Sequence, residues 1–357
     1  MVRTLLICLL VATISFGQTN DSIKQLSQNK KIVLFGEAHS VKEKYDEIKT
    51  FIFKSLDTVS QGKKATLFLE LPGSLNYALN QIKVKKDTSL FLEWFNHVYK
   101  KKDEAPSYFW TDYRDFILEL LQYAENKNIK LEIKCVDREL EFRRTAFILS
   151  SFENKVGTKI DSLLDVNYIK NDSINRFFLL DYVNELTNIT NDSIELEVLN
   201  QLKKALKIDC TICLERDQFM FDNFNKYYDS TDVLVFGSFG LDHVIRKPHF
   251  ATINAFFLAY HKVDTIGHKS LYTLMENDFH NQVFRVGIIA LNQNNKFINM
   301  KMPKDYSHIM NKEERNYIEA LLVNKEVIRV YPSEHEELKN LSSHLDYVII
   351  YGNSNFR

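Results

Sequence analysis

The sequence predicts an α/β protein with a mostly parallel central sheet flanked by helices, and two patterns lead to this prediction. The first is a series of short apolar runs, rich in β-branched residues, that do not alternate with polar ones, as in strands covered on both faces. The second is the helical periodicity of the segments between them. The runs lie at residues 31–36, 65–72, 130–137, 232–238, 283–291, 327–332 and 347–352.

The segments between these runs have the apolar spacing of helices. Clear examples are residues 41–56, after the first strand, and residues 112–128, before the third. Between about residues 140 and 225 no convincing strand pattern occurs, and helical stretches alternate with clusters of Asn, Asp and Ser. We therefore expect residues 18–357 to form a single α/β domain of catalytic type. An all-helical insertion at about 140–225 is expected to cap the carboxyl ends of the strands.

The N-terminus has the pattern of a cleaved secretory signal. Arg3 precedes an apolar run, and the small residues Ser15 and Gly17 stand before Gln18. We expect residues 1–17 to be a signal peptide cleaved near Gly17/Gln18, which predicts a secreted or periplasmic protein with no membrane span after cleavage. The apolar run is short for a bilayer-crossing helix, and an uncleaved anchor is the alternative.

The charge balance argues against polyanionic partners. The chain has 46 Lys and Arg against 47 Asp and Glu, and loss of Arg3 with the signal leaves 45 against 47, a net charge of −2. This balance predicts no attraction to nucleic acid or to anionic membranes. The expected partner is a small-molecule or peptide substrate.

The cysteines indicate no metal site of their own. Cys135 lies in an apolar strand and is expected to be an inert thiol of the core. Cys210 and Cys213 form a CxxC pair that could close into a disulfide in an oxidising compartment, but the sequence offers no second pair for a zinc site. Their redox state stays open.

Acidic and basic side chains stand where the apolar strands end. In open α/β sheets, ligands bind outside the carboxyl ends of the strands. A carboxylate in an apolar strand is costly to bury unless it is paired or used. We therefore expect these side chains to meet at one edge of the sheet. They are Glu37 and His39 after the first strand, Glu70 at the second, Asp137 and Arg138 at the third, and His243 after the fourth.

A helical segment before the fourth strand adds an arginine to this set. In LERDQFMFDNFNKYY, the residues Arg216, Met220, Asn223 and Tyr227 are spaced so that they share one helical face. An arginine on such a face is a candidate partner for a strand-end carboxylate or for a substrate oxyanion. The alternative is a solvated arginine beside Asp217.

The order and spacing of these motifs resemble the superfamily that includes the erythromycin esterases, the ChaN-like haem-binding lipoproteins and the TraB/Tiki proteins. The motifs are a Gly-Glu-x-His turn, a strand-end glutamate before a proline, an ERDxxMxxN helix and a late glycine-to-histidine element. The resemblance implies an α/β fold with an active cleft at the strand ends. The catalytic positions that it implies are Glu37, His39, Glu70, Arg216 and His243. The expected substrate-binding residues are Asp137, Arg138 and Asn223.

Two departures from the pattern limit what the resemblance implies. The first turn reads Gly36-Glu37-Ala38-His39, one residue shorter than the Gly-Glu-x-x-His spacing of the erythromycin esterases, so hydrolysis of macrolides does not follow. The late element reads GSFGLDHV, where a simpler glycine-x-x-histidine is common.

The leading functional hypothesis is a hydrolase that acts on an ester, a lactone or an amide. His39 would take a proton from water, with Glu37 or Glu70 orienting it. Arg216 would stabilise the oxyanion, and His243 would protonate the leaving group or polarise the carbonyl. The sequence has no GxSxG element for a covalent serine mechanism.

Two alternatives use the same residues differently. In a Tiki-like metal-dependent peptidase, a divalent metal such as Zn²⁺ or Mn²⁺ would hold the catalytic water. Its ligands would be His39, His243, Glu37 and Glu70. In a ChaN-like protein, His39, His243 or a tyrosine would ligate haem iron. The cofactor therefore stays open between none, a divalent metal and haem.

Overall fold

The computed structural model describes residues 30–38, 41–97, 108–139, 142–152, 160, 173–208, 214–246, 269–279, 281–295, 300–303 and 306–355. Some of the sequence predictions concern residues outside these ranges. They are the signal peptide at 1–17, the histidine His39, and the cysteines Cys210 and Cys213.

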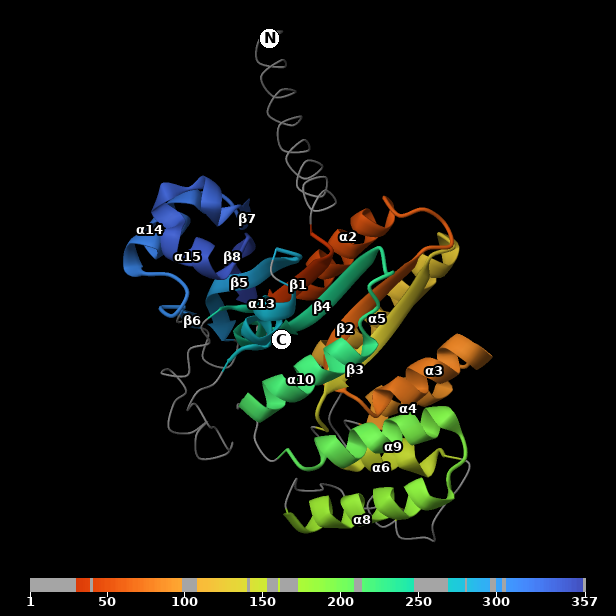
Figure 1. The fold of residues 1–357 in the computed structure, drawn as a ribbon. Helices are drawn as coiled ribbons and strands as arrows, with labels where there is room; N and C mark the ends of the chain where they lie inside the picture. Colours follow the sequence, from red (N-terminus) through yellow and green to blue (C-terminus); the bar gives the residue numbers. More distant parts are fainter. Residues whose placement is uncertain are drawn as a thin grey trace.

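The centre of the protein is an eight-stranded sheet in the order β3-β2-β4-β1-β5-β8-β7, with β6 paired to β5 (Figure 1). The pairs from β3 to β8 are parallel, whereas β7 and β6 pair antiparallel with β8 and β5. The predicted α/β class with a mostly parallel sheet is confirmed. The strands are β1 (Ile32–Glu37), β2 (Lys64–Pro72), β3 (Lys130–Asp137), β4 (Leu234–Gly240), β5 (Val283–Asn295), β6 (Met300–Pro303), β7 (Val327–Val330) and β8 (Tyr347–Asn355).

The continuous apolar runs are explained by burial of the sheet on both faces. In β1, Val33 and Phe35 belong to one hydrophobic core, whereas Ile32 and Leu34 belong to a second core on the other face. Successive side chains of a strand point to opposite faces, so a strand between two cores must be apolar at every position.

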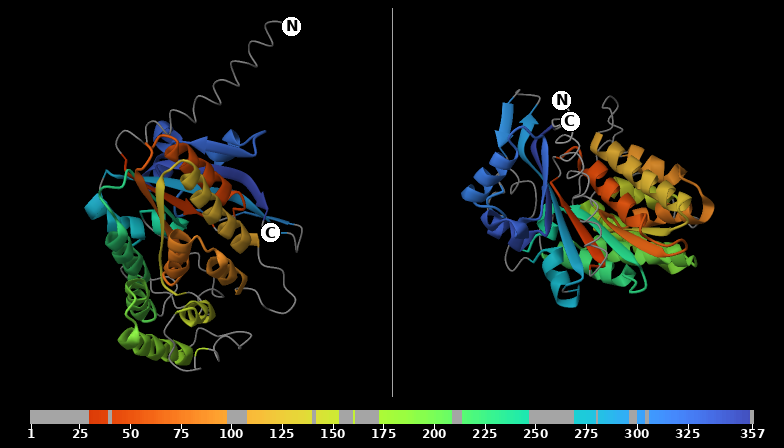
Figure 2. Two further views of the ribbon diagram at one scale, coloured as in Figure 1. Left: turned by 90° about the vertical axis from the view of Figure 1, so that its right-hand side faces the viewer. Right: turned by 90° about the horizontal axis from the view of Figure 1, so that it is seen from above.

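Helices cover both faces of this sheet (Figure 2). The core that contains Val33 includes side chains from α2 (Lys44–Leu56) and α5 (Tyr108–Asn126). The core that contains Leu34 is completed by elements of the second half of the chain. They are α10 (Leu214–Tyr227), α11 (Leu241–Val244), α13 (Leu271–Phe279), α14 (Lys312–Leu321), the short helix η2 (Glu336–Leu338) and α15 (Lys339–His344). A further short helix, η1 (Pro332–Glu334), comes just before η2.

A further group of helices lies beyond the carboxyl ends of β2 and β3 (Figure 1). Gln201 of α9 reaches the end of β3, where its side-chain amide donates to the carbonyl oxygen of Cys135. Two segments of the chain build this group: α3 and α4 come before β3, and α6, α8 and α9 come after it. The two segments are in contact, because α3 packs on α9 and α4 packs on α6. The helices are α3 (Leu75–Lys85), α4 (Ser89–His97), α6 (Phe142–Ser150), α8 (Ser173–Ile189) and α9 (Ser193–Ala205).

The described residues between 140 and 225 contain helices and no strand, but α10 packs on the sheet beside β3. The limits of the predicted insertion, and of the single domain at 18–357, stay a prediction. Cys135 is fully buried, and burial raises the pKa of its thiol, as expected of an inert core cysteine. Within the described ranges, no helix is long and apolar enough to cross a bilayer.

Candidate active site

Three of the polar strand-end residues, Glu70, Asp137 and His243, come together where the direction of the chain connections changes. The chain leaves β1 toward β2 on one side and leaves β4 toward β5 on the other, while β1 and β4 are neighbours. Glu37 of β1 pairs in register with Gly240 of β4, and Pro72 of β2 pairs with Asp137 of β3. In open α/β sheets, ligands bind outside the carboxyl ends of the strands at such a reversal.

Gly36 allows α11 to lie across the end of β1. A Cβ atom at this position would stand 2.9 Å from Cβ of Val244 and 3.3 Å from Cα of Leu241, closer than packed carbon atoms approach. Because α11 carries His243, the glycine brings this histidine over the sheet. The glycine before Glu37 therefore has a packing role that the motif alone did not indicate.

Arg216 binds two of the strand-end carboxylates. Its Nε donates to Oδ1 of Asp137 at 2.9 Å and its Nη2 donates to Oδ2 at 2.6 Å, a bidentate pair. Nη2 also donates to Oε1 of Glu70 at 2.6 Å. Burial alone would lower the pKa of this guanidinium, but Asp137 and Glu70 outweigh it and hold the pKa above its ordinary value. The predicted pairing of Arg216 with strand-end carboxylates is observed, and the alternative of a solvated arginine is wrong because Arg216 is buried.

His243 lies between two carboxylates. Its Nδ1 is 2.6 Å from Oδ1 of Asp217, and its Nε2 is 3.3 Å from Oε1 of Glu70. Asp217 is fixed in turn by the backbone N–H of Leu271, which donates to the same oxygen at 3.1 Å. Burial would lower the pKa of His243, but Asp217 and then Glu70 raise it well above its ordinary value. The two carboxylates therefore favour the protonated form of the imidazole.

Glu70 joins the two halves of this cluster. Besides the contacts with Arg216 and His243, its Oε2 accepts a hydrogen bond from the backbone N–H of Gly240 at 2.5 Å. The side chains of Glu70 and His243 are each 12% exposed, whereas Asp137 is 0% and Asp217 1% exposed. The solvent-facing edge of the cluster is therefore the Glu70–His243 pair, and the aspartates lie behind it.

Glu37 has a different partner on the other face of the sheet. Its Oε2 accepts a hydrogen bond from Nζ of Lys44 at 2.7 Å, and both side chains are buried. Glu37 follows Phe35 on the α2 face, whereas Glu70 follows Phe68 on the α10 face. Burial lowers the pKa of Lys44, and this is opposed by Glu37 and more weakly by Glu70. The charge of Lys44 thus interacts with both glutamates.

Two tyrosines stand near this second group of charges. The rings of Tyr45 and Tyr113 stack with centroids 4.7 Å apart, and both are buried. Burial raises the pKa of each hydroxyl well above its ordinary value, and the charges of Glu37 and Glu70 add to this effect. Both rings are therefore uncharged at physiological pH.

The three predicted substrate-binding residues support the frame of the site. The side-chain amide of Asn223 donates to the backbone carbonyl of Val136 at 3.0 Å, which fixes α10 to the end of β3. Asp137 is fully buried beneath Arg216. Arg138 is buried beside it, and burial together with the charge of Arg216 lowers its pKa to about 10. Their predicted contact with substrate stays a prediction.

Sequence reasoning missed Lys44 and the pairing role of Asp217. Lys44 stands in a charged helix start that looks solvated, and its one signal is its position seven residues after Glu37. Asp217 was considered only as a neighbour that would keep Arg216 in solvent. The signal for Asp217 is its place directly after Arg216, an arginine that faces the sheet. Successive residues of a helix are about 100° apart, so Asp217 points to the side of Arg216, toward α11.

The described residues do not fit the predicted metal site in this arrangement. Both ring nitrogens of His243 face carboxylates, and an imidazole that carries both protons has no lone pair for a metal or for haem iron. Glu37 is bonded to Lys44 instead. Among the residues that the structure describes, no group of three or more His, Cys, Asp and Glu is placed to hold a metal ion. The predicted ligand His39 lies outside those residues.

Comparisons with known proteins give the fold and no closer relationship. No family model matches the sequence, and no curated protein matches it significantly. Among solved structures, a mutant erythromycin esterase in its open conformation is 12% identical, with a TM-score of 0.57 and coverage of 94% of each chain. A protein from Bacillus cereus is 12% identical with a TM-score of 0.53, covering 94% of this chain and 91% of that one. A succinoglycan biosynthesis protein is 11% identical with a TM-score of 0.50, covering 94% of this chain and 90% of that one. The fold predicted from the motif resemblance is therefore confirmed: the chain has the fold of an erythromycin esterase.

Proposed function

We propose that this protein is a hydrolase that cleaves an ester, a lactone or an amide with an activated water molecule. The observation that carries the proposal is the buried cluster in which Asp217 orients His243 and Arg216 orients Glu70 at the carboxyl ends of the strands. The protein and the erythromycin esterase share the fold. Burial of the charges of this cluster costs hydration free energy, which their mutual attraction often does no more than offset. A role in chemistry therefore explains the cluster better than a role in stability.

His243 is proposed to act as the general acid. Its raised pKa keeps the imidazole protonated, and Asp217 fixes the ring through Nδ1 so that Nε2 faces the exposed edge of the cluster. When the tetrahedral intermediate collapses, the C–O or C–N bond breaks and the leaving group takes the proton from Nε2. The imidazole of His243 then regains a proton from solvent at Nε2, while Asp217 holds the ring in its orientation.

The attack is proposed to come from a water molecule near the end of β1. The water oxygen adds to the carbonyl carbon while the C=O π electrons move to the carbonyl oxygen, and a water proton passes to His39, two residues after Glu37. His39 releases this proton to solvent before the next turnover. The salt bridge of Glu37 with Lys44 fixes the carboxylate from which His39 would take its orientation. The proposed role of Arg216 shifts from the substrate oxyanion to the two carboxylates that it binds.

The proposal is tested by comparing two histidine variants. We expect His243→Asn to lower kcat/KM for a panel of nitrophenyl esters and lactones by about 10²–10⁴-fold, as loss of a general acid does. His335→Asn is the matched control. His335 lies between η1 and η2, contacts the hydroxyl of Tyr317 in α14, and is not part of the cluster. A wild-type protein without turnover on every ester, lactone and amide tested, or a His243→Asn variant as active as His335→Asn, would overturn the proposal.

We also propose that this reaction takes place outside the cytoplasm, on a small-molecule or peptide substrate. The support is the signal pattern of residues 1–17 and the near-neutral charge of the remainder. Expression of the whole chain in a bacterium with a periplasm, followed by intact mass measurement, tests the first point. Loss of the mass of residues 1–17 is expected, and a periplasmic protein that keeps this mass contradicts the predicted cleavage.

A further inference from the structure

A second polar site lies at the opposite end of the sheet. A pocket of about 170 Å³ is formed where Lys30 precedes β1, Val283 begins β5 and Asp346 precedes β8. These are the amino ends of parallel strands, whereas the cluster around Glu70 lies at the carboxyl ends. Pockets for drug-sized ligands have about 300–1,000 Å³, so this one suits a small ligand.

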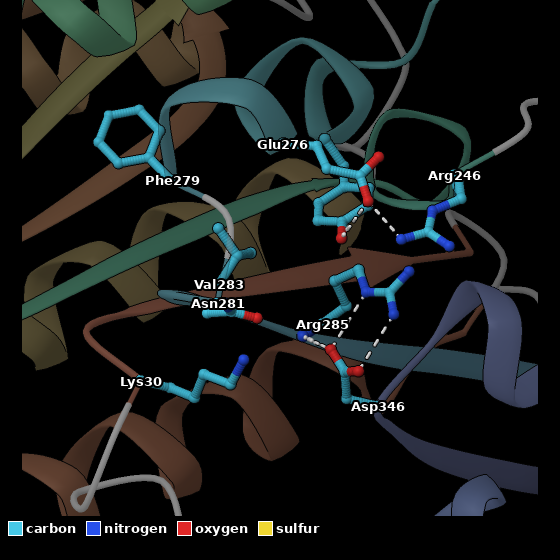
Figure 3. A pocket seen from close by; sticks show the side chains of 9 residues that line it. Lys30, Arg246, Glu276, Phe279, Asn281, Val283, Arg285 and Asp346 are labelled. Carbon is cyan, nitrogen blue, oxygen red and sulfur yellow. Dashed lines mark hydrogen bonds and ion pairs between the residues drawn. The ribbon is translucent and has the colours of Figure 1, made fainter.

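The pocket carries more positive than negative charge. Lys30, Arg246 and Arg285 line it, against two carboxylates, Glu276 and Asp346. Arg246 pairs with Glu276, and Arg285 pairs with Asp346 (Figure 3). No carboxylate among the described residues lies within ion-pair distance of Lys30. One positive charge is therefore left without a carboxylate in the described part of the pocket.

Arg285 has hydrogen-bonding capacity that its neighbours do not use. Its Nε and Nη2 donate to Asp346, each at 3.1 Å, and its Nη1 donates to the carbonyl oxygen of Ser343 at 3.3 Å. A guanidinium has five N–H groups, so two remain without an acceptor within the described residues. The side chain is only 7% exposed, so bulk water has little access to these two donors. The guanidinium also stands 4.5 Å from the ring centroid of Tyr272, which fixes its position.

The two arginines line the same pocket. Figure 3 shows Arg246 paired with Glu276 and, below them in this view, Arg285 paired with Asp346. Three cations that line one pocket with two carboxylates leave a net positive charge, which an anion bound among them would neutralise. The planar fork of an arginine matches the oxygen atoms of a phosphate. Lys30 approaches from a third side, near Asn281.

We propose that this pocket binds a phosphate group, held by Arg246, Arg285 and Lys30. The phosphate is either inorganic phosphate or the head of a small phosphate monoester. Phe279 and Val283 line the same pocket and offer an apolar surface to the carbon stem of a monoester. The site is separate from the proposed hydrolytic cluster, so it binds its ligand whether or not that cluster is catalytic.

The test is calorimetric titration of the full chain in phosphate-free buffer of low ionic strength. The probes are inorganic phosphate, phenyl phosphate and acetate. We expect saturable binding of inorganic phosphate, with acetate at least about tenfold weaker because it has one negative charge and two oxygen atoms. Phenyl phosphate tighter than inorganic phosphate identifies a monoester site, and the reverse order identifies a site for the free ion.

Substitutions assign the binding to the pocket. Arg246→Gln and Lys30→Gln are each expected to weaken phosphate binding by about tenfold or more. Lys325→Gln is the matched control, because Lys325 is an exposed lysine after α14, away from the pocket. Neither Arg246 nor Lys30 is buried, so we expect both variants to keep the fold. The thermal midpoint of each variant checks this. Absence of saturable binding, acetate binding as tight as phosphate, or equal weakening by Lys325→Gln overturns the proposal.

Discussion

The two charged groups of this protein are built in different ways. In the cluster at the carboxyl ends of the strands, one carboxylate, Glu70, is shared by Arg216, His243 and a backbone N–H. In the pocket at the amino ends, each arginine has a carboxylate of its own. Charges that share one carboxylate depend on one another, whereas pairs that share no carboxylate depend on one another less. The first group thus has the interdependent charges that the proposed chemistry needs, and the second has the separate cations that the proposed binding needs.

The largest expected difference between the two groups is in stability. Arg216→Met would leave Asp137 fully buried without its cation, and we expect the free energy of unfolding to fall by about 3–5 kcal/mol. Arg246→Met removes a side chain that is 43% exposed, and the expected loss is about 0–1 kcal/mol. Urea unfolding of both variants measures the contrast. Equal losses would show that the two groups do not differ in this way.

A smaller effect is expected in the pH dependence of stability. The pKa of His243 is raised in the folded protein, so folding favours its protonated form. The contribution of His243 to the free energy of unfolding is fully present below the ordinary histidine pKa of about 6.5. It is lost as the pH rises through the elevated pKa of the folded protein. The free energy of unfolding of the wild type should therefore exceed that of His243→Asn most at mildly acidic pH. This difference in free energy should narrow in alkaline solution. The comparison is made by urea unfolding at a series of pH values. A gap that is constant over this range would mean that the folded protein does not hold His243 protonated.

The smallest effect is expected from chelation. Because both ring nitrogens of His243 face carboxylates, we expect hydrolysis to continue unchanged after dialysis against a strong chelator. The assay compares treated protein with treated protein to which Zn²⁺ or Mn²⁺ is returned. Loss of turnover that either metal restores would favour the metal-dependent alternative and a different arrangement of His243.

Most of the sheet could be predicted from the sequence because strands buried on both faces are apolar throughout. The fourth strand was placed two residues early, at 232–238 instead of Leu234–Gly240. Asp232 lies just before the strand, where its carboxylate accepts a hydrogen bond from the hydroxyl of Thr66 in β2. The short antiparallel strand β6 was not predicted, because its sequence, MKMP, has no β-branched residue.

The candidate site could be predicted in part. Glu70 was found because a charge inside an apolar strand is conspicuous, and Arg216 because it shares a helical face with Met220, Asn223 and Tyr227. Lys44 was missed because a lysine at a helix start is ordinary, and only the fold brings it to Glu37. The pocket at the amino ends could not be predicted, because Arg246 and Arg285 come from segments with no shared pattern. The base assigned to His39 stays a prediction.

The bonds of Glu70 also bear on how the protein folds. Arg216 and Gly240 lie 146 and 170 residues away from Glu70 along the chain. Contacts of such long sequence separation form late, because the loops that they close must first lose their conformational entropy. A chain still being synthesised, and ending before β4, would contain Glu37, Glu70 and Arg216 but lack the partner backbone and His243. The bonds of Glu70 to Gly240 and His243 would thus form only near the completion of folding, and the proposed hydrolytic activity would appear no earlier.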